Sequence, residues 1–196
     1  MIPHLLNDPQ QYRIQRALDE GRLIITPDPQ PRDPGQPNCP YDTTAVDLHL
    51  GTSLSIPQVG SFNYDLRKKG PFPKFLSRNC DHVEISGNGY VLEPGKFVLG
   101  ITHERIGLPL VAGHQLAGRI EGKSSVARCG LLVHFTAPTV HAGGDGPLAL
   151  EMIKLGTAGF TLFPGLAMCQ LIVEIVFGDP TANPSQFQGQ SRPSGF

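Results

Sequence analysis

The sequence predicts a mainly β protein with a single domain built from many short strands. Its 196 residues include 23 glycines and 19 prolines, which separate short apolar runs and do not gather in one linker. Residues 90–95, YVLEPG, are echoed by residues 160–165, FTLFPG, at an offset of 70 positions that also relates Glu104 to Glu174. Two copies of a strand, a Pro-Gly turn and a second strand suit two hairpins of a jelly roll or related barrel.

The length and charge of the chain limit the kinds of partner that it can bind. A domain of this size buries roughly 70% of its unfolded surface, which is enough for a core. Sixteen basic and 17 acidic residues give a net charge of −1, so no basic field is available to hold nucleic acid. No apolar stretch reaches the roughly 18 residues of a membrane span, and the N-terminus lacks the pattern of a signal peptide. We therefore expect a cytoplasmic protein with neither a nucleic-acid nor a membrane partner.

The four cysteines lack metal-binding or redox spacing. No pair forms a C-x-x-C motif, and Cys129 and Cys169 lie in apolar runs. Both are predicted to be buried thiols, which suits a reducing cytoplasm.

The N-terminal half begins with a predicted helix over about residues 8–20. Asp8 suits the N-cap, Pro9 the first helical position and Gly21 the stop, with apolar residues spaced to share one face between them. A short strand at 23–25 and an irregular loop at 26–40 follow. Residues 46–50, VDLHL, alternate apolar and polar side chains, which predicts a strand with one solvated or interfacial face that resumes at 54–56.

Residues 61–81 combine a short basic run with aromatic side chains and prolines. This composition predicts a surface insertion, and steering of a polyphosphate is the alternative interpretation.

The central stretch, residues 122–151, contains the strongest candidates for chemistry. A helical turn at 124–129 with Ser124 as N-cap would leave backbone N–H groups suited to an anion. An apolar run at 131–137 and a Pro/Gly-rich reversal lead to a second apolar strand that contains Glu151. A carboxylate among such neighbours would be desolvated and suited to general-base chemistry, unless it simply faces outward from the strand.

The motifs along the chain occur in a recognisable order. They are ALDEGRLIITP at 17–27, TTAVDLHLG at 43–51, GKSSVAR at 122–128, VHFTA at 133–137, a glutamate 27 positions after Ser124, and FQGQ at 187–190. Together they span about two thirds of the chain and resemble the dCTP deaminase family of the dUTPase superfamily. The resemblance implies a distorted jelly-roll β-barrel of the dUTPase-like type, with an N-terminal helix and one short helix at the SSVAR motif.

The resemblance also implies a domain organisation. Residues 1–178 would form the single barrel domain. Residues 179–196 contain almost no core-forming side chains, so they cannot form a strand layer of their own. They are predicted to be a flexible C-terminal tail that serves as a lid over the active site.

The same resemblance assigns roles to individual residues. Glu151 would be the general base that activates a water for attack on C4 of cytosine. Ser124 would help to hold this water, and Arg128 would lie beside the pyrimidine and the carboxylate. From the residues alone, Ser124 and Arg128 could equally be a helix cap and a surface cation. The substrate-binding set would be Lys123, Ser125, Phe135, Thr136, Ala137, His141, Gln170, Gln186 and Gln190.

Within that set, several roles are more specific. Phe135 and Ala137 would act through their backbone groups. Gln170 would lie near the phosphates, or would be an ordinary polar residue at a strand edge. His134, beside them, is predicted to be a hydrogen-bonded strand histidine and not a catalyst.

Two positions depart from the family pattern. Lys123 stands where the family usually has arginine, which keeps the charge but loses the bidentate fork that suits phosphate oxygens. His141 replaces the aspartate with which dUTPases activate water for attack on phosphate. This replacement argues against diphosphatase chemistry.

Other nucleotide chemistries lack their motifs. A zinc deaminase needs H-x-E together with P-C-x-x-C, and His82-Val83-Glu84 supplies only the first half. No G-x-x-x-x-G-K-[ST] sequence is present either. We therefore expect no zinc and no metal held by protein ligands; Mg2+ would arrive bound to the triphosphate.

The expected function is a zinc-independent dCTP deaminase that forms dUTP and ammonia in pyrimidine deoxynucleotide metabolism. The family resemblance implies a homotrimer with active sites between subunits. The alternatives are a bifunctional dCTP deaminase and dUTP diphosphatase giving dUMP, a deaminase of a modified cytosine nucleotide, and a non-catalytic nucleotide-binding regulatory relative. The joint presence of Ser124, Arg128 and Glu151 argues against the last.

Overall fold

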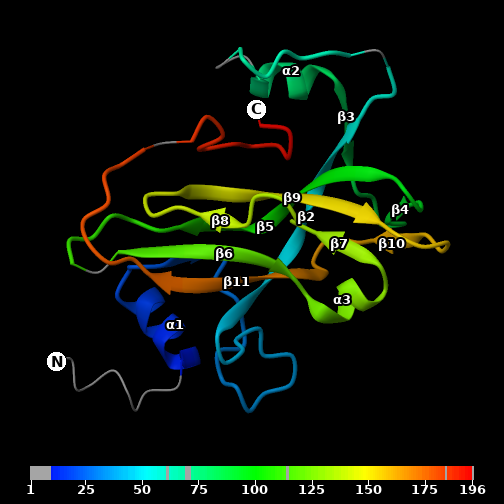
Figure 1. Cartoon of the computed structure of the whole chain (residues 1–196). Helices are drawn as coiled ribbons and strands as arrows, with labels where there is room; N and C mark the ends of the chain where they lie inside the picture. Colours follow the sequence, from blue (N-terminus) through cyan, green and yellow to red (C-terminus); the bar gives the residue numbers. More distant parts are fainter. Residues whose placement is uncertain (1–9, 61, 69–71, 114, 184, 196) are drawn as a thin grey trace.

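The protein is described by a computed structural model, which covers residues 10–60, 62–68, 72–113, 115–183 and 185–195. Strands dominate it (Figure 1), so the mainly β prediction is confirmed. The helices are α1 (Gln10–Asp19), α2 (Phe72–Arg78) and α3 (Ser124–Arg128). The strands are β1 (Ile24–Thr26), β2 (Ala45–Pro57), β3 (Cys80–Glu84), β4 (Tyr90–Leu92), β5 (Phe97–Gly107), β6 (Leu116–Gly122), β7 (Leu131–Val133), β8 (Thr139–Val140), β9 (Asp145–Lys154), β10 (Phe160–Leu162) and β11 (Ala167–Ile175).

Nine of these strands form one curled antiparallel sheet in the order β7-β9-β5-β2-β11-β6-β8, with β1 paired to β5 and β3 to β2. The long strand β2 joins its two halves. The first part of β2 pairs with β11, and the second part pairs with β5 and β3. The sheet therefore curls around β2 into a half-barrel, in keeping with the predicted jelly-roll type.

A β-bulge in β2 marks the bend. The register with β5 shifts between Leu50 and Leu54. Gly51 lies inside this bulge, where an added Cβ would come within 3.0 Å of the Ile101 carbonyl oxygen. Glycine is needed there because the two backbones approach too closely for a side chain.

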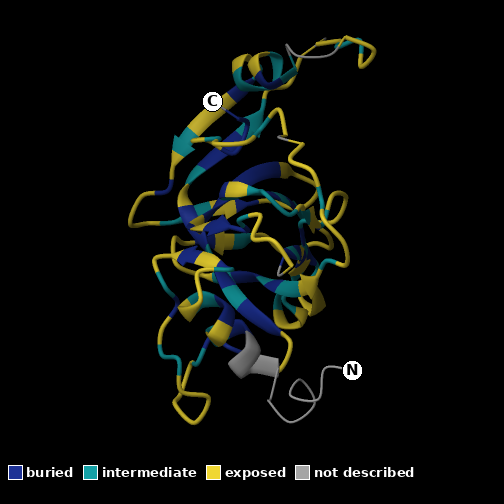
Figure 2. Cartoon of the chain, turned by 90° about the vertical axis from the view of Figure 1, so that its left-hand side faces the viewer, coloured by how far each residue is buried: buried dark blue, intermediate teal, exposed yellow. Residues whose placement is uncertain are grey.

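The core lies inside the curl, where Figure 2 shows the buried residues concentrated. Alternate residues of the central strands face it, as period-two alternation requires. The following residues have no exposed surface: Val46, Leu48, Leu50 and Leu54 of β2, Val98 of β5, Leu150 and Met152 of β9, and Leu171 of β11. The alternation predicted for residues 46–50 is confirmed, because Asp47 and His49 lie on the other, half-buried face.

The echoed segments form equivalent strand–turn–strand units, β4 followed by β5 and β10 followed by β11. The prediction that each unit is a hairpin is wrong, because β5 pairs with β1, β2 and β9, and β11 pairs with β2 and β6. The short strands β4 and β10 also pair with each other, Tyr90 opposite Leu162 and Leu92 opposite Phe160, as a separate two-stranded sheet. The sequence echo is therefore the signature of two copies that contact each other.

The predicted N-terminal helix appears as α1, and the first two residues of its predicted range lie outside the described residues. Gly21, with a φ of 67°, ends it. The N–H of Gly21 bonds to the Leu18 carbonyl at 3.0 Å, and the N–H of Arg22 bonds to the Ala17 carbonyl at 2.9 Å. These two bonds form a Schellman motif, which explains why the predicted glycine stop works.

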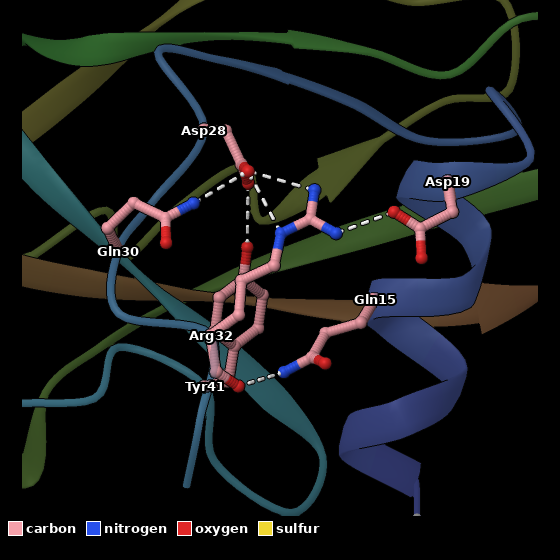
Figure 3. A network of polar contacts seen from close by, with 6 residues as sticks. All are labelled: Gln15, Asp19, Asp28, Gln30, Arg32 and Tyr41. Carbon is pink, nitrogen blue, oxygen red and sulfur yellow. Dashed lines mark hydrogen bonds and ion pairs between the residues drawn. The ribbon is translucent and has the colours of Figure 1, made fainter. Parts of the chain in front are cut away.

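A polar network fastens the irregular loop 26–40 to α1 (Figure 3). Asp28 accepts hydrogen bonds from Gln30, Arg32 and Tyr41, at 2.9, 2.9 and 3.0 Å. Arg32 also pairs with Asp19 of α1 at 2.5 Å. Burial, followed by the hydrogen bond to Asp28, raises the pKa of Tyr41, so the phenol stays protonated as a donor. The loop thus has a fixed path without regular secondary structure.

The insertion at 61–81 contains a helix that its composition did not predict, α2. Tyr64 packs against Phe72 and Phe75 with ring centroids 5.2 and 4.8 Å apart, and Pro73 is buried. Figure 1 shows α2 standing above the main sheet, next to the C-terminal end of the chain. None of the helices among the described residues is long and apolar enough to cross a membrane.

Candidate active site

Glu151 lies in the middle of β9, opposite Leu99 of β5. Its neighbours Leu150 and Met152 are fully buried in the core, whereas Glu151 itself is only half-buried. The prediction that apolar sequence neighbours would bury the carboxylate is wrong, because successive residues of a strand point to opposite faces. Glu151 instead projects from the outer face of the sheet, where a substrate can reach it.

The loop after β7 holds the Glu151 carboxylate. The backbone N–H of Thr136 donates to Glu151 Oε2 at 3.1 Å, and Thr136 Oγ1 lies 2.5 Å from both carboxylate oxygens. The His134 N–H also donates to the Glu151 carbonyl at 2.7 Å. Charge-assisted bonds of this kind fix the carboxylate at one place on the sheet.

The strand predicted at 131–137 is shorter in the structure. Strand β7 ends at Val133, because His134 adopts a left-handed φ of 52° and reverses the chain. Its ring Nε2 lies 2.8 Å from the Ala137 carbonyl oxygen and must donate to it. The other ring nitrogen, Nδ1, is buried without a hydrogen-bond partner. His134 is thus a loop residue with one ring nitrogen unpaired, whereas a fully bonded strand histidine was predicted.

The loop residues Phe135, Thr136 and Ala137 are exposed around Glu151. Phe135 makes an edge contact with Phe97 at the start of β5, with ring centroids 6.5 Å apart. Of these three residues, Thr136 is the one for which the structure records hydrogen bonds to Glu151.

Helix α3 follows the predicted motif but is capped differently. The N-cap residue is Lys123, with no side-chain cap bond, so Ser124 is the first residue of the helix and not its cap. Ser124, Ser125 and Arg128 are exposed. In the described part of the chain no hydrogen bond joins these side chains to Glu151. The structure therefore leaves this group of predicted site residues facing outward.

Of the two cysteines predicted to be buried, one is buried and the other is exposed. Cys169 on β11 has no exposed surface, and its burial raises the pKa of the thiol. Cys129 is exposed, contrary to prediction. It terminates α3, which lies outside the sheet, and the buried run begins only at Leu131.

Lys123 and Gln170, which were both predicted to contact phosphate, bind the same carboxylate, that of Asp47. The sequence analysis did not identify Asp47 as a site residue. Lys123 forms an ion pair with one Asp47 oxygen, and Gln170 Nε2 donates to the other at 2.9 Å. Gln170 is on β11, between β2 and β6, so it is not an edge residue. The VDLHL alternation placed Asp47 off the core face, but no local pattern showed which cation it would meet.

Beside Asp47 on the same strand, His49 pairs with Glu104, which is 2% exposed. The His49 N–H and Nδ1 approach the two carboxylate oxygens at 2.9 and 2.6 Å. The hydrogen bond that the His49 ring donates to Glu104 raises the pKa of His49, while desolvation lowers it by less. The pair joins β2 to β5 on the face that carries Asp47.

This pair makes stability depend on pH. Because the folded-state pKa of His49 is raised, its contribution is fully present below the unfolded value of about 6.5 and is lost as pH rises through the folded pKa. We expect the melting temperature to fall more steeply in the wild type than in His49→Gln as the pH rises above about 6.5. Circular dichroism melts measure this, with the exposed His103→Gln as control; equal slopes in the wild type and His49→Gln would contradict it.

The remaining predicted residues lie elsewhere on the surface. His141 is exposed in the turn before β9, where its carbonyl accepts the Gly144 N–H at 2.9 Å. Gln186 is exposed, and Gln190 Nε2 donates to the Pro147 carbonyl at 3.0 Å, at the start of β9. Gln190 thus reaches the strand that carries Glu151, whereas Gln186 has no such contact among the described residues.

No group of three or more His, Cys, Asp or Glu side chains is arranged to hold a metal ion in the described ranges.

Comparisons with known proteins show to which family the chain belongs. A family model described as dCTP deaminase-like matches residues 10–176. The chain is 36% identical to a dCTP deaminase of Rhodospirillum rubrum over 174 residues, covering 87% of this chain and 83% of the relative. It is 30% identical to a dUMP-forming dCTP deaminase of Methanothermobacter thermautotrophicus over 190 residues, covering 92% and 88%.

A solved structure supports the fold. The 2'-deoxycytidine 5'-triphosphate deaminase from Agrobacterium tumefaciens superposes with a TM-score of 0.61 at 19% identity, over 85% of this chain and 47% of that one. With the matched family model spanning most of the molecule, the chain belongs to the dCTP deaminase-like family of enzymes.

Proposed function

We propose that this protein hydrolyses dCTP to dUTP and ammonia without zinc, with Glu151 as general base. The observation that carries the proposal is the Glu151 carboxylate, half-buried on the outer sheet face and held by the N–H and hydroxyl of Thr136. Such a carboxylate is oriented before substrate arrives and remains accessible to water.

In the proposed reaction, Glu151 carries both protons of the attacking water. It takes the first proton as the water oxygen attacks C4 of the cytosine ring, and passes it to N3 as the tetrahedral intermediate forms. It then takes the second proton from the new C4 hydroxyl and passes it to the amino group, which leaves as ammonia. The water oxygen becomes the O4 carbonyl of uracil, and Glu151 is regenerated.

The other predicted residues would serve binding and positioning. Ser124 would hold the water, and Arg128 would lie beside the pyrimidine. The backbone groups of Phe135 and Ala137 would read the base edge. Lys123, Ser125 and Gln170 would meet the phosphates of the Mg2+-bound triphosphate, for which Lys123 and Gln170 must leave Asp47.

We further propose a homotrimer with active sites between subunits, working in the cytoplasm. The support is that Ser124, Ser125 and Arg128 are exposed and that, in the described part of the chain, no hydrogen bond joins them to Glu151 of their own chain. A neighbouring subunit is the simplest source of the missing half of each site. Exposed apolar side chains near α3 and the β4–β10 ribbon, such as Val91, Phe163 and Leu166, would be covered in such an assembly.

Thr136 gives a matched pair of variants. Thr136→Val removes the hydroxyl donor to Glu151, so kcat should fall roughly tenfold or more, the cost of one hydrogen bond to a charged group. Thr136→Ser keeps the donor and should stay near wild type. Steady-state ammonia release measures both; equal losses in the two variants would contradict a specific role of the hydroxyl, because Thr136→Ser keeps it.

The experiment that tests the function is turnover of dCTP with chromatography of all nucleotide products. We expect dUTP and ammonia in equal amounts, because His141 cannot act as the aspartate that orients water toward the α-phosphate. The second candidate is a bifunctional enzyme, favoured by relatives named dUMP-forming. Stoichiometric dUMP and pyrophosphate would establish that candidate, and no turnover of dCTP would refute deamination. His141→Asp is the matched variant for the diphosphatase step.

A further inference from the structure

The end of the C-terminal tail is buried against its own chain. Pro193, Ser194 and Gly195 are buried, and Ser194 has no exposed surface. Ser191 and Arg192 hydrogen-bond to Gly195 in a tight turn, with N–O distances between 3.0 and 3.2 Å. The turn carries no large apolar side chain that would drive its burial. Its burial therefore depends on how closely the neighbouring surface fits it.

That surface is formed by α2 and the strands beneath it. Phe187 of the tail packs edge-on against Phe72, with ring centroids 6.3 Å apart and an interplanar angle of 89°. A Cβ built on Gly195 would lie 3.3 Å from Pro73 and 3.5 Å from Phe187. Gly195, whose φ is 123°, therefore fits between the helix and the tail's own aromatic ring, where a side chain would be strained.

A chain of hydrogen bonds fastens the turn from below. Ser194 Oγ lies 3.2 Å from Ser55 Oγ of β2, which lies 3.1 Å from His82 Nδ1 of β3. The other nitrogen of His82 donates to the Ser77 carbonyl of α2 at 3.0 Å. The turn, the main sheet and the insertion helix are thus joined by one line of polar contacts, with no apolar gap between them.

The preceding part of the tail crosses the sheet face that carries Glu151. Gln190 bonds to Pro147 of β9, and Gln188 Nε2 lies 3.4 Å from the Gly143 carbonyl oxygen. Residues two positions apart on a strand share a face, so Pro147, Ala149 and Glu151 lie on one side of β9. A cleft of about 520 Å³ opens on this side, with Ile101 and Pro147 in its lining and Ser191 and Arg192 at its border.

We infer that the insertion helix α2 is a latch for the C-terminal tail. The tail is then a strap fixed at both ends: it leaves the sheet after β11 and is fastened again at residues 191–195. The latch holds Gln190 over the Glu151 face before any nucleotide binds. The tail is therefore already positioned next to the substrate site, which lowers the entropic cost of closing over the substrate. The docking stands on the contacts alone; the effect on nucleotide binding rests on the proposed function.

Docking is tested without nucleotide through Phe187→Trp, which gives the chain its only tryptophan. In this background, Phe72→Ala and Ser194→Ala should each raise acrylamide quenching of the emission by about twofold or more, because the ring leaves its contact. Phe177→Ala, a tail-side phenylalanine with 95% exposure, is the control. Quenching equal to the control in both variants would overturn the proposal that the tail docks on α2. Ser194→Ala changes one oxygen atom and guards against a result due to unfolding of α2.

The functional arm uses a chain that stops at Gln190. Loss of the residues after Gln190, which removes the contact of Ser194 with Ser55, should raise KM for dCTP roughly fivefold with little change in kcat, the size expected for one hydrogen bond. Unchanged KM overturns the role of the latch in substrate binding. If no variant, including wild type, turns over dCTP, the proposed function fails while the quenching data still decide the docking.

Discussion

Glu151→Gln is expected to lower the rate of dCTP deamination by at least about 10²-fold, because general-base catalysis contributes typically 10²–10⁴. The amide has the shape of the carboxylate, and its oxygen can still accept the Thr136 N–H. It cannot take a proton from water. The loss should therefore appear in kcat, with nucleotide affinity by calorimetry and melting temperature close to wild type.

Glu174→Gln is the matched control, since Glu174 is an exposed strand glutamate on β11. It should deaminate dCTP at the normal rate. If Glu151→Gln retained near-normal kcat, Glu151 would be removed from the mechanism, and the proton acceptor would have to be sought among other groups on the loop after β7.

A mixture of two inactive variants is expected to recover activity. Arg128→Ala should be nearly inactive because the cation beside the pyrimidine is lost, and Glu151→Gln because the base is lost. If each site takes Glu151 from one subunit and Arg128 from its neighbour, every mixed trimer has one intact site in three, so about one third of the sites is restored. Recovery requires exchange of subunits, so the proteins are co-expressed with different tags and purified through both.

The structure motivates this experiment because, among the described residues, no hydrogen bond or ion pair joins an α3 side chain to Glu151 of its own chain. Activity of the mixed protein no higher than that of the separate variants would place both residues of a site in one subunit. Mixing Glu151→Gln with Thr136→Val gives the control: these two residues touch within one chain, so no intact pair is created at the Glu151 side by exchange.

Several features followed from the sequence alone. The offset of 70 residues predicted two equivalent strand–turn–strand units, which β4–β5 and β10–β11 form, although their strands pair with other strands and not as hairpins. The alternation around Asp47 predicted which face of β2 is buried, and Gly21 predicted the end of α1. These predictions work because local backbone geometry and period-two burial depend on neighbours in the chain.

The tertiary structure decided the environment of the site. Glu151 lies among apolar residues in the sequence and yet is half-buried beside Thr136, because its apolar neighbours face the opposite side of the sheet. Asp47 meets Lys123 from 76 positions away, and Ser194 meets Ser55 from 139 positions away. A helix inside an insertion that composition marked only as surface receives the tail. Pairings at such separations depend on how the sheet curls, and they leave no periodic trace in the residues that make them.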